Sequence, residues 1–69
     1  MKEVFIKSIG GNYYYLDISD RHIVRKTEWG EEVGSMKIDI LLSISFHDRV
    51  LQQEYFEIYE LAKKYLILL

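Results

Sequence analysis

The chain contains no cysteine and no proline, and only four of its 69 residues are glycine. The absence of cysteine excludes disulfide bonds, thiolate metal ligands and thiol nucleophiles. One core in a domain of this size rarely supplies more than about 3–5 kcal/mol of net stability, and natural domains of this length add disulfides, a metal or a partner subunit. Since disulfides are excluded, we expect a very apolar core, association with another subunit, or both.

The chain also lacks a large excess of charge of either sign and any long apolar run. Nine basic and eleven acidic residues give a formal net charge of −2, which excludes a highly basic nucleic-acid tail and a highly acidic disordered chain. No apolar run approaches the roughly 18–20 residues of a membrane span, and the first residues lack the apolar segment of a signal peptide. The sequence therefore predicts a cytoplasmic protein without a membrane span.

Hydrophobic residues make up 49% of the chain and aromatic residues 14%. This composition and the short length predict one globular domain over residues 1–69. Alternation of apolar and polar residues predicts four strands, separated by glycine or polar turns, and a helical periodicity predicts one helix. The expected strands are residues 2–9, 13–18, 22–29 and 37–46, and the expected helix is residues 47–68.

The fourth predicted strand and the helix carry the clearest patterns. Every second residue is large and apolar from Ile38 through Ile40, Leu42, Ile44 and Phe46. The helix, capped by Ser45 or Asp48, has one apolar stripe that consists of Leu51, Tyr55, Ile58, Ala62, Tyr65 and Leu69. These patterns predict an α+β fold (ββββα), in which a long C-terminal helix covers one face of a four-stranded antiparallel meander.

The first two strands divide their side chains between two faces. The expected helix-facing set is Val4, Ile6, Tyr14, Leu16 and Ile18, which leaves Phe5, Ile9, Tyr13 and Tyr15 on the other face. The aromatic residues there either stabilise the sheet as cross-strand pairs or form a contact surface for a partner. We expect a partner surface made of Phe5, Tyr13, Tyr15 and Trp29. The strand order and the buried face of the third strand stay open.

The end of the predicted helix is apolar on all sides. A helix of about 22 residues is roughly 33 Å long, whereas strands of about eight residues span roughly 26 Å, so the helix should extend beyond the sheet. We expect self-association as a dimer through Tyr65, Leu66, Leu68 and Leu69. The alternative is that Leu66–Leu69 fold back on the same chain.

Residue types with catalytic or metal-binding chemistry are present, but their spacing favours structural roles. Asp17, Asp20 and His22 cluster at a predicted turn, and their spacing fits no standard metal site. His47 and Asp48 lie where the fourth strand ends and the helix begins, which explains them as a strand end and a helix cap. We therefore expect no catalytic residue, no metal site, no cofactor and no enzymatic activity.

The small size, the many aromatic residues and the mixed charge favour a protein that occupies the surface of another protein. We expect a small protein-interaction module that acts stoichiometrically as an inhibitor or adaptor, of the kind encoded by viruses and mobile elements. The alternative is a single-stranded nucleic-acid binder that stacks bases on Phe5, Tyr13 and Tyr15. Such a site needs a strong positive field, which this composition supplies only weakly.

Overall fold

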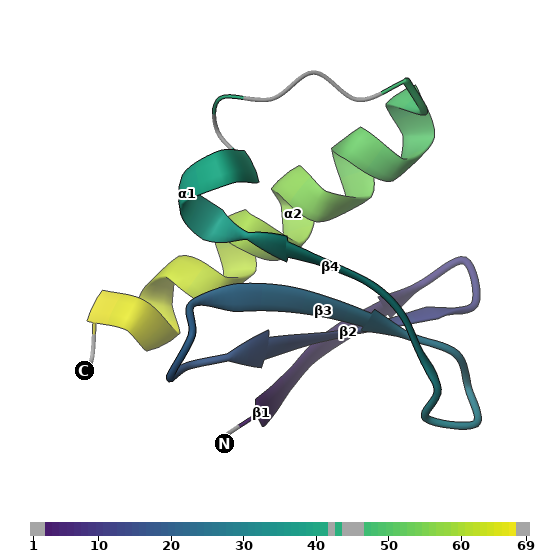
Figure 1. The fold of residues 1–69 in the computed structure, drawn as a ribbon, viewed down its shortest axis with the longest axis horizontal. Helices are drawn as coiled ribbons and strands as arrows, with labels where there is room; N and C mark the ends of the chain where they lie inside the picture. Colours follow the sequence, from purple (N-terminus) through teal and green to yellow (C-terminus); the bar gives the residue numbers. More distant parts are fainter. Residues whose placement is uncertain (1–2, 42, 44–46, 68–69) are drawn as a thin grey trace.

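The computed structural model describes residues 3–41, 43 and 47–67. Its elements are β1 (Glu3–Ile9), β2 (Asn12–Asp17), β3 (His22–Lys26), β4 (Glu32–Lys37), α1 (Ile38–Leu41) and α2 (Arg49–Ile67). The strands form an antiparallel sheet in the order β1-β2-β3-β4 (Figure 1). The predicted α+β fold, a four-stranded meander followed by a C-terminal helix, is confirmed. Within the described residues, no helix has the length and apolar content needed to cross a membrane.

Two tight turns fix the pairing of the first three strands. Gly10 and Gly11 connect β1 to β2 with positive φ angles of 54° and 86°, which glycine adopts without strain and two-residue hairpin loops require. Between β2 and β3, the Asp17 carboxylate accepts a hydrogen bond from the backbone N–H of Asp20 at 3.1 Å. Both turns lie at the glycine and polar residues from which turns are predicted.

A β-bulge in β1 changes which of its side chains face the helix. Phe5 pairs with Tyr15, but the next paired residue is Lys7, opposite Tyr14, so Ile6 has no partner of its own. Such an extra residue reverses the alternation of side chains beyond it. As a result Ile9 packs against the core under the helix, and the prediction that Ile9 lies on the other face is wrong.

The prediction of a strand over residues 37–46 is also wrong. The fourth strand is Glu32–Lys37, and residues 38–41 form α1, whose Ile38 and Leu41 are buried while Ile40 is 47% exposed. Residues three apart share a face on a helix, whereas residues two apart share one on a strand. β3 has only five residues, so a longer fourth strand would have backbone groups without partners. Residues 42 and 44–46 of the predicted strand lie outside the described residues.

Helix α2 begins and packs largely as its sequence pattern predicts. Asp48 caps it, because the carboxylate accepts hydrogen bonds from the backbone N–H groups of Val50 and Leu51, both at 3.0 Å. Ser45, the other predicted cap, lies outside the described residues. The described part of the predicted apolar stripe faces the sheet, with Tyr55, Ile58 and Ala62 buried and Leu51 and Tyr65 packed against the core. Leu69, its last predicted member, lies outside the described residues.

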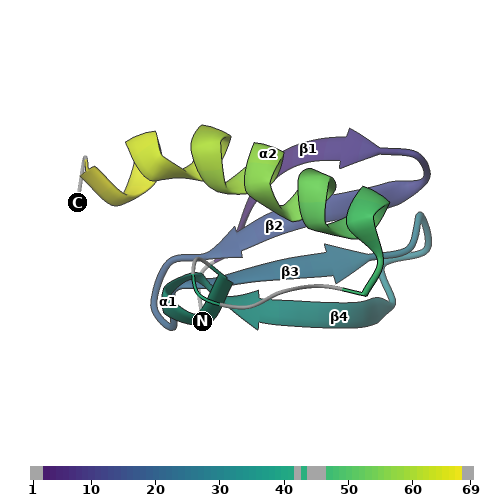
Figure 2. The same cartoon turned by 90° about the horizontal axis from the view of Figure 1, so that it is seen from above.

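The hydrophobic core lies between the sheet and the two helices. Figure 2 shows α2 running obliquely over the β1–β2 side of the sheet, with its C-terminal end extending past the strands. The buried cluster consists of Tyr14, Leu16, Ile23, Ile38, Leu41, Tyr55, Ile58 and Ala62. All of these side chains point into the space between the sheet and the helices. The fold therefore has two layers, with helices covering one face of the sheet.

Tyr14 joins the sheet to α2 by both apolar and polar contacts. Its side chain is fully buried, and its ring meets the Tyr55 ring edge to face at 5.5 Å between centroids. The Tyr14 hydroxyl donates a hydrogen bond of 2.6 Å to Oε1 of Glu54, which also accepts one from Asn12 at 3.2 Å. Burial, together with the Glu54 carboxylate, raises the pKa of Tyr14 well above its ordinary value.

This raised pKa predicts a loss of stability at alkaline pH. Above pH ~10 the unfolded chain releases the Tyr14 proton while the folded protein keeps it, so the free energy of unfolding falls by up to about 1.4 kcal/mol per pH unit. Tyr14→Phe should cost about 1.5–3 kcal/mol at neutral pH because its hydrogen bond to a carboxylate is lost. The same variant should have a shallower alkaline decline, as measured by urea unfolding between pH 7 and pH 11.

Tyr13→Phe provides the matched control, since Tyr13 lies on the other face of the same strand and should retain the wild-type alkaline decline. An equally steep decline in Tyr14→Phe and in wild type would contradict the assignment to Tyr14.

Candidate interaction surface

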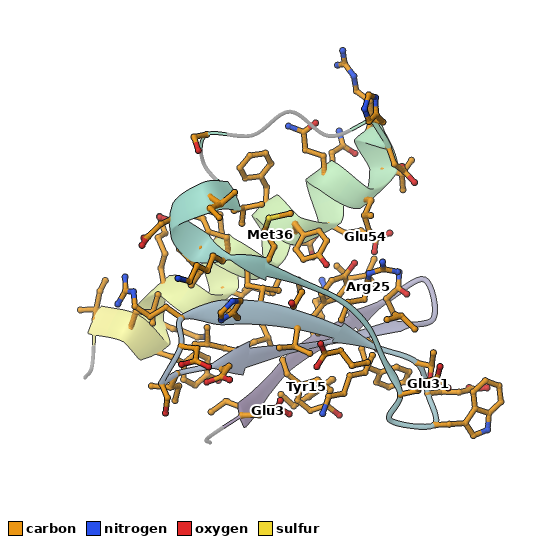
Figure 3. All side chains as sticks on the ribbon, viewed as in Figure 1. Glu3, Tyr15, Arg25, Glu31, Met36 and Glu54 are labelled. Atoms are coloured by element: carbon orange, nitrogen blue, oxygen red, sulfur yellow. The ribbon has the colours of Figure 1, made fainter. Side chains whose placement is uncertain are left out.

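The face of the sheet turned away from α2 is called the outer face here. Residues that pair directly across antiparallel strands lie on the same face, so the register defines its composition. Three cross-strand rows make it up, from one end of the sheet to the other: Glu3, Asp17, His22 and Lys37; then Phe5, Tyr15, Val24 and Ser35; then Ser8, Tyr13, Lys26 and Glu32. Figure 3 shows Glu3 and Tyr15 on this side, while Arg25, Met36 and Glu54 lie between the sheet and α2.

Three of the four predicted partner-surface residues form one aromatic cluster on the outer face. The Phe5 ring lies 5.4 Å from the Tyr15 ring in an edge-to-face arrangement and 6.2 Å from the Tyr13 ring, centroid to centroid. Phe5 is 49% exposed, and the two tyrosines are partly exposed. These distances are typical of favourable aromatic pairs, so the cluster is held in place by its own contacts while it remains open to solvent.

Trp29, the fourth predicted residue, is not part of this cluster. It lies in the β3–β4 turn with 84% of its side chain exposed. The Thr27 hydroxyl accepts hydrogen bonds from the backbone N–H groups of Trp29 and Glu31, at 3.3 and 3.2 Å, and fixes this turn. Tyr13 pairs with Lys26, and Trp29 follows Lys26 by three residues. Trp29 therefore lies at the same end of the sheet as Tyr13.

An ion pair crosses the aromatic cluster. The ammonium group of Lys26 lies 4.7 Å from the centre of the Tyr15 ring and 2.7 Å from Oε1 of Glu3. Both charged side chains are largely shielded from solvent, with relative exposures of 21% and 23%. The hydrogen bond to Glu3 raises the pKa of Lys26. The Lys26 cation is therefore already engaged by a carboxylate and an aromatic ring of the same chain.

Next to the aromatic cluster the outer face is hollowed by about 200 Å³. Its wall contains four acidic residues, Glu3, Asp17, Asp20 and Glu32. The other lining residues are His22, Val24 and Ser35. Val24 is 4% exposed and Asp17 is 5% exposed. The hollow is open to solvent, and within residues 3–41, 43 and 47–67 no group of three or more histidine, aspartate or glutamate side chains is placed to hold a metal ion.

The hollow brings together residues that sequence reasoning had separated. The sequence places Asp17, Asp20 and His22 near one another at one turn. Glu3, Glu32 and Ser35 are far from them in the sequence and join them only through strand pairing. Period-two alternation could have placed Glu3 on the same face as Phe5. Nothing local indicates that Val24 is buried on the outer face, because its neighbours Tyr15 and Ser35 come from two other strands.

The predicted self-association residues are only partly placed. Tyr65 and Leu66 pack against the core as half-buried side chains, while the adjacent Ile67 is 81% exposed. Leu68 and Leu69 lie outside the described residues. The helix end therefore has one strongly exposed apolar residue among those described here, and the predicted interface stays a prediction.

Comparison with protein families, with curated proteins and with solved structures finds no match to this chain.

The shielding of the Lys26–Glu3 pair predicts a measurable energetic coupling. We expect a double-mutant cycle with Glu3→Gln and Lys26→Met to give a larger coupling free energy than the same cycle with Glu57→Gln and Lys7→Met. The Lys7–Glu57 pair is equally short at 2.6 Å, but each side chain is about half exposed, and exposed ion pairs contribute little. Urea unfolding measures both cycles, and equal couplings would contradict an ordered ion pair over Tyr15.

Proposed function

We propose that this protein is a small, non-enzymatic protein-interaction module that binds a partner protein stoichiometrically on its outer face, as an inhibitor or adaptor does. The observation that carries the proposal is the exposed aromatic cluster of Phe5, Tyr13 and Tyr15 beside a hollow. Tyrosine and phenylalanine are enriched at protein interfaces, because they bury a large area for few rotatable bonds. Because the partly exposed rings already contact one another, the cluster loses little conformational entropy when it is covered.

The surroundings of the cluster resemble the rim of a protein interface. Lys26 and Glu3 border the rings as a formed ion pair, and the hollow adds concave shape next to them. A polar rim around an apolar centre is the usual anatomy of specific protein–protein contacts. The open hollow also supports a binding role over catalysis, which needs a nucleophile or acid–base pair held around an enclosed substrate.

Self-association belongs to the same proposal. A chain of 69 residues gains stability when part of its apolar surface is covered by a second copy. The sequence pattern favours the helix end for this contact, and the exposure of Ile67 supports that choice. Against it, Tyr65 and Leu66 already contact their own core.

A first test is affinity capture from extracts of the source cells with a tagged chain. Phe5→Thr with Tyr15→Thr removes two of the three rings of the cluster and puts in residues that favour strands. We expect at least one protein, held by wild type, to be retained about tenfold less by this variant, since central aromatic anchors typically contribute more than 1 kcal/mol. The retained protein is then titrated as a purified component to establish a saturating, stoichiometric complex.

The matched control is Val50→Thr, which removes an exposed apolar side chain (66% exposed) at the start of α2. Circular dichroism confirms that both variants fold. If every captured protein binds wild type, the outer-face variant and the control equally, the outer face is not the docking surface.

The nucleic-acid alternative yields a separate prediction. Glu3, Asp17, Asp20 and Glu32 surround the hollow next to the rings, and Lys26 is already paired. Phosphate groups would be repelled there, since single-strand binding requires a positive groove. We expect no retention on a single-stranded oligonucleotide resin at low salt. Salt-dependent retention that is lost in Tyr13→Ala with Tyr15→Ala would favour the alternative over the protein-interaction module.

A further inference from the structure

Strand β4 is an open edge of the sheet. The sheet order places it at one end, and in the described part of the chain it pairs only with β3. Four of its six residues are exposed and none is buried. Figure 2 shows α2 over the opposite, β1–β2 side of the sheet. The backbone N–H and C=O groups along the free edge of β4 are therefore available to another strand.

The central part of β4 lacks charge and proline, two of the features by which edge strands prevent pairing, although a β-bulge lies at Glu32 and Val33. Its four central residues, from Val33 to Met36, carry no charge and include no proline, and Val33 is 41% exposed. Natural edge strands place charges or proline in this central position. The two charges of β4 lie at its ends instead and have opposite signs, Glu32 at one end and Lys37 at the other.

Opposite charges at the two ends make β4 complementary to itself in the antiparallel direction. In a symmetric pair centred on Ser35, each Ser35 lies opposite Ser35 of the second copy, and Gly34 lies opposite Met36. Because of the shift in register beside Glu32, the side chain of Glu32 lies on the outer face. Lys37 lies on the same face. At each end of the pair, Glu32 and Val33 then lie opposite Lys37 of the second copy, on the same face.

Neighbouring registers are less favourable. With Glu32 and Val33 again counted as one position, a pair centred on Gly34 places both of them opposite Ser35 of the second copy, and Lys37 then faces no acidic residue of β4. A pair centred on Met36 extends each strand into Ile38, which is the first residue of α1. In the register centred on Ser35, Gly34 lies opposite the large Met36, and opposite charges lie opposite each other at both ends. The sequence of β4 therefore favours this register.

We infer that β4 is the interface through which a second copy of this chain binds, so that two four-stranded sheets form one continuous sheet of eight strands. The inference deepens the self-association part of the proposed function and assigns it to β4 in place of the helix end. It is independent of the partner-docking part. One consequence concerns the hollow: because Glu32 and Ser35 line it, Lys37 of the second copy is brought to its border.

A single cysteine tests this register. Since the chain has no cysteine, Ser35→Cys has one thiol, at a position that faces itself in the pair. Directly opposed residues of antiparallel strands have Cα atoms about 4.5–5.5 Å apart, within the range that a disulfide spans. We expect Ser35→Cys to form a disulfide-linked dimer under mild oxidation, and wild type to sediment as a dimer at high micromolar concentration.

The matched cysteine control is Ser8→Cys. Ser8 is also exposed and also on the outer face, but it lies in β1 at the opposite edge of the sheet. Ser8→Cys should therefore still sediment as a dimer but form no disulfide-linked dimer under the same oxidation. Equal rates of cross-linking at the two positions, or a wild type that sediments as a monomer, would overturn the inference.

A charge exchange separates β4 from the helix end. Lys37→Glu alone places two carboxylates together at each end of the pair and should abolish the dimer, while Glu32→Lys with Lys37→Glu restores opposite charges and should restore it. Ile67→Glu, at the exposed end of α2, should leave the dimer intact. A dimer that is lost in Ile67→Glu and retained in Lys37→Glu would assign self-association to the helix and refute the β4 interface.

Discussion

The packing of one face of the sheet on α2 is the contact on which the rest of the structure depends, and Tyr14 lies at its centre. Its ring is buried against Tyr55 and its hydroxyl is bound by Glu54. Among the described residues, α2 is the one long helix that can cover the sheet. Burial on one face therefore leaves the other face without cover, and the properties of the outer face follow from that limit.

Without cover, the outer face is stabilised by contacts between its own side chains. Phe5 and Tyr15 pack edge to face, Lys26 crosses the Tyr15 ring to reach Glu3, and Val24 is buried between its cross-strand neighbours. These contacts hold apolar rings in place at the surface, which is the condition for a binding site that needs little reorganisation. The free edge of β4 has the same cause, because a single long helix covers only part of the sheet. A meander of four strands has two edge strands, and α2 lies over the side that contains β1.

The sequence was sufficient to predict the fold but not the details that shape the surface. Tyr55, Ile58 and Ala62 recur at helical spacing, and the Gly10–Gly11 turn punctuates the first hairpin, so both features follow from local pattern. Ile38 and Ile40 also alternate like a strand, yet a short apolar run fits a strand or a helix equally well. In the structure, pairing with β3 ends at Lys37, opposite His22, and α1 begins at the next residue. The bulge beside Phe5 and the burial of Val24 both depend on strand pairing, which no local pattern encodes.

The central claim is that one face of the sheet makes the fold and the other face is left for binding. The three consecutive tyrosines of β2 test it most directly, because Tyr14 faces the core whereas Tyr13 and Tyr15 lie on the outer face. The measurement is the free energy of urea unfolding for Tyr13→Ala, Tyr14→Ala and Tyr15→Ala. The account predicts a loss of about 3–5 kcal/mol for Tyr14→Ala, enough to unfold a domain of this size, and about 1 kcal/mol or less for each of the other two. A larger loss at Tyr13 or Tyr15 than at Tyr14 would contradict it.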